Sequence, residues 1–134
     1  MTYYSRTGEG SSFQEHFAIL DEEAMRLSFG KDKGFICSTM CLYMRDAPKM
    51  SKKCREAIDT GNNQGLAHAA HSLKGMTAYF SRAGLYDACL ALEYLGRENG
   101  LPLESPRANN LYATLSSTMK DLTSAMHAYM DEVH

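Results

Sequence analysis

The segment HAAHSLKG at positions 68–75 combines residue types that could do chemistry on an anionic group. His68 and His71 are three residues apart, so their imidazoles would share one face if the segment is helical. Lys74 and Gly75 follow His71 within about one helical turn. A neutral imidazole is a nucleophile near neutral pH, and a nearby ammonium can pair with an anionic group attached to it. The segment could also be a buried structural patch or a metal site.

The helical phase of this segment directs His71 away from the core. Apolar or small residues recur at the spacing of one buried helical face, at Leu66, Ala70, Leu73, Thr77 and Phe80. At about 3.6 residues per turn, His71 points about 140° from the centre of that stripe. His68 and Gly75 point in similar directions, and Lys74 lies on the flank. A helical glycine costs about 1 kcal/mol relative to alanine, and we interpret Gly75 as leaving the imidazole uncovered.

The helix that carries this segment is one of several that the sequence predicts. Helix starts are predicted at Asp21, Asp32, Asn62 or Asn63, and Ser105, and helix ends at Gly30, Gly61 and near Gly100. The apolar stripe from Ile36 to Ala57 keeps its phase across Pro48, which favours one kinked helix, or two nearly collinear helices, over a loop. A short helix is also predicted near residues 13–18. We therefore predict an all-α fold for residues 13–134, an antiparallel four-helix bundle with short extra N-terminal helices, after a flexible leader at residues 1–12.

Composition argues against several classes of function. The chain has 134 residues, the size of one domain, and its formal net charge of −2 argues against a general nucleic-acid binder. No apolar run approaches the roughly 20 residues that span a bilayer, and the first residues do not resemble a secretion signal. The four cysteines lack a zinc-binding pair, so we interpret them as reduced, partly buried thiols. We expect a cytoplasmic monomer without nucleic-acid or membrane contact.

The segment lacks the partners that an enzyme site would need. We find no Asp or Glu on the same helix face that could activate His71, and no glycine-rich loop that could bind the phosphates of ATP. The chain offers a nucleophile and a cation without catalytic machinery. This combination is typical of a passive acceptor whose partner brings the catalysis.

The string AHSLKG and the residues that follow it resemble the histidine phosphotransfer (HPt) domain of two-component phosphorelays. The family's pattern has a histidine, then an apolar residue, Lys, Gly and a small residue, which here are His71, Leu73, Lys74, Gly75 and Thr77. The pattern continues at Phe80, Leu85, Leu92 and Glu93. The resemblance covers roughly residues 17–130. The sequence departs from the pattern at Tyr79, Ser81 and Arg82.

This resemblance implies a phosphocarrier, not an enzyme with a catalytic activity of its own. His71 would take a phosphoryl group on Nε2 from the phosphoaspartate of a receiver domain and pass it to another receiver. Lys74 would stabilise the phosphate, and Gly75 would leave access to the ring. No cofactor is expected, because Mg²⁺ would come with the receiver. The implied partners are response-regulator receiver domains, a hybrid sensor histidine kinase, or both. For the partner-binding surface we predict Leu66, Ala67, His68, Ser72, Met50 and Arg82.

Other functions are compatible with parts of this sequence. The chain could be a helical interaction module that binds partners without phosphotransfer, because such a sequence would look much the same. His68 and His71 could bind a metal weakly, but a structural zinc site needs four ligands. His16, His127 and the cysteines have no evident reason to converge on them. The dimerisation helix of a histidine kinase fits poorly, because such helices resemble H-E-x-R-x-P-L.

Overall fold

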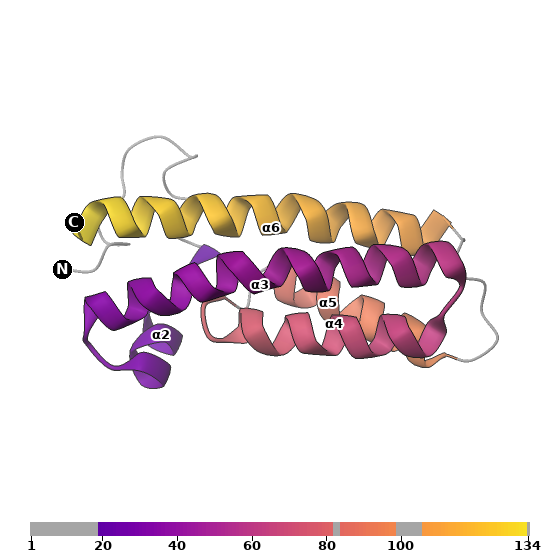
Figure 1. Ribbon diagram of the computed structural model, residues 1–134, viewed down its shortest axis with the longest axis horizontal. Coiled ribbons are helices and arrows are strands. Elements are labelled where there is room, and N and C mark those ends of the chain that lie inside the picture. Colours follow the sequence, from indigo (N-terminus) through magenta and orange to yellow (C-terminus); the bar gives the residue numbers. More distant parts are fainter. Residues whose placement is uncertain (1–18, 82–83, 99–105, 134) are drawn as a thin grey trace.

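The computed structural model describes residues 19–81, 84–98 and 106–133 (Figure 1). This part of the chain contains no strand and five helices: α2 (Glu22–Phe29), α3 (Lys33–Thr60), α4 (Asn63–Ala78), α5 (Gly84–Arg97) and α6 (Pro106–Val133). The prediction of an all-α fold is therefore confirmed. The predicted leader at residues 1–12 and the predicted helix near residues 13–18 lie outside the described residues.

The four longer helices form an antiparallel bundle, as predicted. α3 packs against α4 and α6, and α5 packs against the same two helices, so the four helices surround one core. Consecutive helices of the bundle run in opposite directions in Figure 1. α3 and α6 have 28 residues each, whereas α4 has 16 and α5 has 14. At about 1.5 Å per residue, α3 extends about 18 Å beyond α4. The short helix α2 lies beside this extension (Figure 1).

The ends of these helices follow from local sequence. The side chains of Asp21, Asp32 and Asn62 each accept a hydrogen bond from a backbone N–H three residues further on, at 3.0, 3.1 and 2.8 Å. These are the predicted N-terminal caps, which satisfy donors that have no partner inside the helix. Gly30 and Gly61 end α2 and α3 with φ angles of 77° and 68°, a region that favours glycine. The predicted boundaries at these five positions are confirmed.

Pro48 lies inside the continuous helix α3, which confirms one helix in preference to a loop. A proline in this position leaves the carbonyl of Met44 without its helical donor. Pro48 is exposed, so this interruption falls on the face of α3 that water can reach. The apolar stripe of α3 can therefore stay buried on both sides of the proline.

The bundle encloses a single apolar core. Buried side chains from all five described helices belong to one cluster. Cys54 and Cys89 are fully buried within it, and burial raises the pKa of each thiol to about 12. Both thiols therefore stay protonated near neutral pH. Among the described helices, none combines the length and the apolar character needed to cross a membrane.

Candidate functional site

His71 lies on the exposed face of α4, as its helical phase predicted. The buried face of α4 is formed by Leu66, Ala69, Ala70, Leu73 and Thr77. The side chain of His71 is 61% exposed, and His68 is exposed on the preceding turn. At Gly75, an added Cβ would meet no atom within 4 Å. The surface beside the imidazole is therefore open, and a second molecule can approach the ring.

A carboxylate from the neighbouring helix contacts the imidazole, and the sequence analysis missed its role. Glu93 lies on α5 and is buried, and its Oε2 lies 2.9 Å from Nδ1 of His71. The helix face of His71 itself carries no acid in the sequence, and this carboxylate comes from the adjacent helix. Glu93 nevertheless carries a signal in the sequence, because it falls four residues after Cys89 on the apolar stripe of its own helix. A carboxylate on a buried stripe needs compensating partners, so its position indicates a polar cluster.

Two cations complete this polar cluster. The Lys74 ammonium lies 2.7 Å from Oε1 of Glu93, and the Arg97 guanidinium contacts Oε2, the oxygen that also faces His71. Oε1 has no hydrogen bond of good geometry, so the charge of Lys74 compensates for its burial. Lys74 is only 18% exposed, whereas Arg97 is 58% exposed. Lys74 is therefore held against the carboxylate, and Arg97 lies at the edge of the cluster.

These contacts keep Glu93 ionised. Burial alone would raise the pKa of its carboxyl group, but Lys74, His71 and Arg97 together lower the pKa below its ordinary value of 4.5. The contact with Glu93 in turn raises the pKa of Lys74 above its ordinary value. Both members of the pair are therefore charged near neutral pH, and an ionised carboxylate can only accept hydrogen bonds.

A close approach between α4 and α5 brings this cluster together. A Cβ at Gly96 would lie 2.6 Å from the backbone nitrogen of Ala67 and 2.7 Å from the carbonyl oxygen of Asn63. No ordinary side chain fits there without a shift of one helix. Gly96 lies one turn after Glu93 on α5, so the helix approaches α4 closely just beyond the carboxylate.

One member of the predicted partner-binding surface is wrong. Leu66 is fully buried in the core, so it cannot contribute to a docking surface. It belongs to the same apolar stripe that directed His71 outward, and that stripe packs inside the bundle. His68 is exposed, and Arg82 lies outside the described residues. The half-buried members of the prediction are Met50, Ala67 and Ser72. The partner-binding role of these residues stays a prediction.

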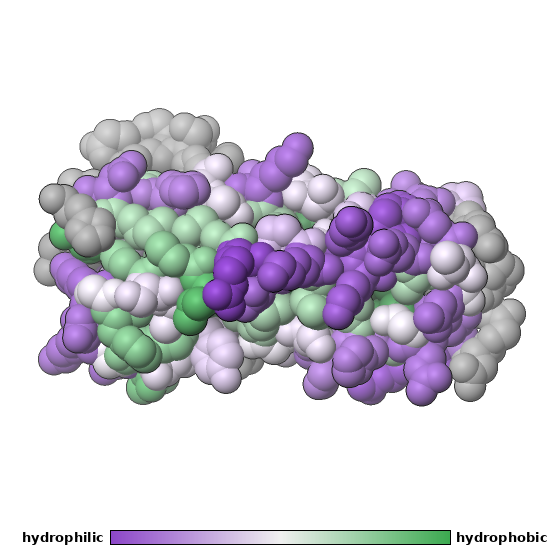
Figure 2. Space-filling view, in the orientation of Figure 1, coloured by the Kyte–Doolittle hydropathy of each residue, from purple (hydrophilic) through white to green (hydrophobic). Residues whose placement is uncertain are grey.

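Exposed apolar side chains gather elsewhere, near the end of α4. The large exposed apolar residues of the described chain include Leu27, Phe35, Leu42 and Tyr79. Tyr79 lines one hollow with Leu27 and a second hollow with Leu42. Figure 2 shows more apolar surface at the end of the molecule where α2 lies, and mainly hydrophilic surface at the other end. In the sequence, Tyr79 is distinguished only as a departure from the histidine phosphotransfer pattern.

The described residues contain no cluster of three or more His, Cys, Asp or Glu side chains that could hold a metal ion. The imidazole of His71 is instead paired with Glu93. In this arrangement one ring nitrogen faces a buried carboxylate and the remainder of the ring is exposed. This geometry suits a histidine that reacts with a group presented by another molecule.

The protein is a helical bundle that exposes His71, whose imidazole contacts a carboxylate from the next helix. The family model described as the Hpt domain matches residues 39–133. The chain therefore belongs to the Hpt domain family, whose members carry phosphoryl groups by histidine phosphotransfer in phosphorelays, with receiver domains and kinases as partners. No curated protein and no solved structure gives a significant match.

Proposed function

We propose that this protein relays a phosphoryl group between receiver-domain aspartates through His71. The observation that carries the proposal is the contact between Nδ1 of His71 and Oε2 of Glu93 at 2.9 Å, beneath an exposed imidazole. Membership of the Hpt domain family supports the reaction class. The choice of His71 over His68 rests on this contact and on the Lys74 and Gly75 that follow His71.

The carboxylate of Glu93 determines which ring nitrogen can react. Because the ionised carboxylate only accepts hydrogen bonds, Nδ1 of His71 carries the proton and donates it to Oε2. In the neutral ring, the lone pair is then on Nε2. Glu93 thus acts as a positioning residue, since it sets both the tautomer and the orientation of the imidazole.

The transfer step balances without a base on this chain. The lone pair of Nε2 attacks phosphorus, the bond from phosphorus to the aspartyl oxygen breaks, and that electron pair stays on the aspartate as a carboxylate. The imidazole becomes positively charged as the N–P bond forms, while the proton stays on Nδ1. Glu93 stabilises this charge from 2.9 Å, in a site where burial strengthens the interaction. The same steps in reverse deliver the phosphoryl group to the next receiver.

Lys74 and Arg97 act on this step in different ways. The Lys74 ammonium holds Oε1 of Glu93, which keeps the carboxylate in place beneath the ring. Arg97 shares Oε2 with the imidazole, and its exposed guanidinium has further donors for a phosphoryl group. Gly75 leaves the approach to Nε2 open. The Mg²⁺ ion that receiver chemistry needs would be supplied by the receiver domain.

The test is incubation with receiver domains that carry a labelled phosphoaspartate, with His71→Gln compared against His68→Gln. His68 is the matched control, because it is an exposed histidine on the same helix one turn earlier. We expect acid-labile, alkali-stable label on the wild type and on His68→Gln, and none on His71→Gln. Label that persists on His71→Gln would overturn the site. Stable receiver binding without any transfer would instead support an interaction module.

A further inference from the structure

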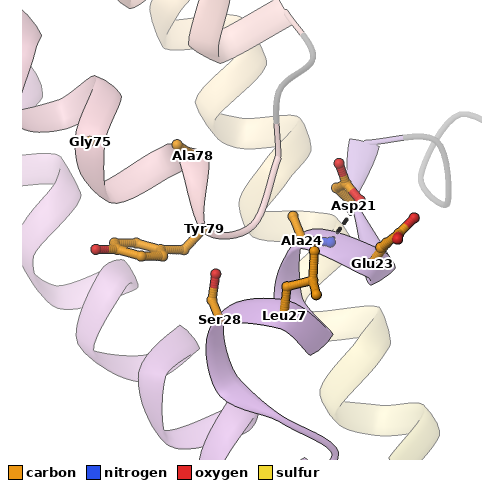
Figure 3. A pocket seen from close by; sticks show the side chains of 8 residues that line it. All are labelled: Asp21, Glu23, Ala24, Leu27, Ser28, Gly75, Ala78 and Tyr79. Carbon is orange, nitrogen blue, oxygen red and sulfur yellow. Dashed lines mark hydrogen bonds between the residues drawn. The ribbon is translucent and has the colours of Figure 1, made fainter.

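A hollow of about 530 Å³ lies between α2 and the last turns of α4, beside Gly75 (Figure 3). Leu27 and Ser28 line it from α2, Gly75 and Ala78 line it from α4, and Tyr79 follows directly after α4. Gly75 has no side chain and Ala78 has only a methyl group, so the α4 wall is low. The phosphocarrier reaction described above uses Gly75 alone among these residues.

Fixed contacts between α2 and α4 preform this hollow. The backbone N–H of Asp21 donates a hydrogen bond to the carbonyl oxygen of Phe80 at 2.7 Å, which joins the start of α2 to the residues after α4. At the other end of α2, the ring of Phe29 packs against Tyr79 and Phe80, with centroids 5.7 and 5.3 Å apart. The two walls are therefore held in position before any partner binds.

The rim of the hollow is apolar and exposed. Leu27 is 73% exposed and Tyr79 is 52% exposed, although large apolar side chains are usually buried. Both side chains belong to the walls of the hollow, so an apolar group that entered between them would remove them from water. An aromatic and a leucine side chain beside a depression make the type of site that anchors a partner's apolar side chain.

The charge of the hollow is opposite to that of the polar cluster on the other side of His71. Asp21 and Glu23 line the hollow, and none of its described lining residues is basic, although Arg26 on α2 lies 3.9 Å from Glu23. Lys74 and Arg97 lie on the α5 side of the imidazole. The histidine thus lies between an acidic, apolar hollow and a basic edge, and this asymmetry can orient a partner by its own charges.

A partner that reaches His71 must also cover the hollow. Tyr79 follows His71 by eight residues, which is about 12 Å along the helix axis and about 80° around it. A standard interface buries about 800 Å² on each partner, which corresponds to a disc of radius about 16 Å. A receiver domain centred on the imidazole therefore covers Gly75 and Tyr79. Its surface must either fill the hollow with a side chain or leave water in it.

We propose that this hollow selects the receiver partner. It takes an apolar side chain from the receiver's surface between Leu27 and Tyr79, with a neighbouring Lys or Arg of the receiver against Asp21 and Glu23. This inference rests on the phosphotransfer function proposed above. It adds a contact that recognises the partner's surface and takes no part in the chemistry at His71.

The experiment measures the second-order rate of phosphoryl transfer from a labelled receiver, after all receivers of the source organism have been profiled with the wild type. Leu27→Ser and Tyr79→Ser should each lower this rate about tenfold with the preferred receiver, because each removes an apolar anchor. The matched control is Tyr94→Ser, since Tyr94 is 54% exposed and follows Glu93 on α5 but does not line the hollow, so it tests apolar contact near His71 outside the hollow. This variant should stay within about twofold of the wild type.

Phosphorylation by the small donor phosphoramidate separates docking from chemistry. All three variants should react with phosphoramidate at the wild-type rate, because the small donor needs no docking surface. Glu23→Lys should lower transfer from the receiver and leave the phosphoramidate reaction unchanged.

Each failure has a distinct signature. Wild-type transfer from the receiver by Leu27→Ser and Tyr79→Ser would overturn the hollow and leave the phosphocarrier function standing. An unaffected Glu23→Lys would overturn the basic part of the proposed partner. A wild type that accepts no phosphoryl group from any receiver would overturn both proposals. Thermal unfolding followed by circular dichroism would show whether Tyr79→Ser has lost the fold. Leu27 is more exposed, so Leu27→Ser tests the hollow with less effect on folding.

Discussion

The two sides of His71 are built on different principles. On the α5 side, Glu93 contacts the imidazole, Lys74 and Arg97, and every charge in this cluster has an opposite charge within reach. On the α2 side, an open hollow is bordered by the exposed side chains of Leu27 and Tyr79. The α5 side is a network of ion pairs next to a close approach of two helices, whereas the α2 side is an open hollow lined by side chains.

This difference indicates how each side should respond to change. In the network, removing one group leaves its neighbours with uncompensated charge, so the effects of substitutions depend on one another. In the hollow, each apolar side chain contributes separately through the area that a partner covers. The α5 side should therefore control stability and the chemistry together, whereas the α2 side should control only the choice of partner.

The largest effect on stability and transfer together is expected from Gly96→Ala, which would force the backbones of α4 and α5 apart. The new Cβ would lie 2.6 Å from the nitrogen of Ala67, so the two helices must separate. Overpacking of this kind costs about 1–3 kcal/mol of unfolding free energy, and a displacement of about 1 Å at the reacting group can cost about 100-fold in rate. Urea unfolding and the transfer rate measure the two effects.

Gly34→Ala is the control for this substitution. Gly34 is also a helical glycine, and its added Cβ would meet only a side-chain oxygen of Asp32 at 3.3 Å. This control should change stability by well under 1 kcal/mol and leave transfer unchanged. If Gly96→Ala behaved like the control, the close approach of α4 and α5 would not be what positions Glu93.

The next largest effect is expected from Glu93→Gln, which keeps an acceptor oxygen but removes the charge. Hydrogen bonds to charged groups contribute about 1.5–3 kcal/mol, so transfer through His71 should slow by about tenfold to 100-fold. Phosphoramidate labelling should slow by the same factor, because the small donor still needs the oriented ring. A loss confined to receiver-dependent transfer would assign Glu93 to docking and contradict its positioning role.

The same variant gives a pH test of the network. The pKa of Glu93 is lower in the folded protein than its ordinary value of 4.5, because of Lys74, His71 and Arg97. Its ionised form therefore stabilises the fold above pH 4.5, and this contribution is lost as the pH falls through the folded pKa. The difference in unfolding free energy between wild type and Glu93→Gln should shrink as the pH falls below 4.5. A difference that grew at acid pH would contradict the assignment.

Lys74→Ala and Arg97→Ala would compare two cations on one carboxylate. Lys74 is mostly buried against Oε1, so its removal leaves a buried oxygen uncompensated and should cost about 1–2 kcal/mol of unfolding free energy. Arg97 is more than half exposed, so its removal should cost only a few tenths of a kcal/mol. Urea unfolding ranks the two, and equal costs would mean that burial does not decide the contribution.

The sequence predicted the features that depend on neighbouring residues. The exposure of His71 and Gly75 followed from the helical period, and the caps at Asp21 and Asp32 followed from side chains that bond three residues away. Each of these features can be predicted from the residues of a single helix. The closed bundle followed from the number and phase of the stripes, because each apolar face must be covered by another helix.

The features that sequence analysis missed depend on contacts between helices. Glu93 is 22 residues from His71, and only the packing of α5 on α4 makes them neighbours. The hollow beside Tyr79 likewise needs α2 and α4 in their relative positions. The error at Leu66 has another origin, since its place on the apolar stripe already predicted burial. The assignment of Leu66 to the partner-binding surface therefore contradicted the helical phase of α4.

The smallest effect is expected at Gly75, which lies between the two sides. Gly75→Ala adds a methyl group that meets no atom within 4 Å, so the helix should gain about 0.5–1 kcal/mol and phosphoramidate labelling should not change. Gly75→Glu adds bulk and negative charge beside Nε2, so it should slow transfer while helix content stays nearly the same. Circular dichroism, urea unfolding and both labelling reactions distinguish the two variants. If Gly75→Ala slowed receiver-dependent transfer as much as Gly75→Glu, the receiver would contact the α4 backbone itself at this position, and the hollow and the cluster would form one continuous surface.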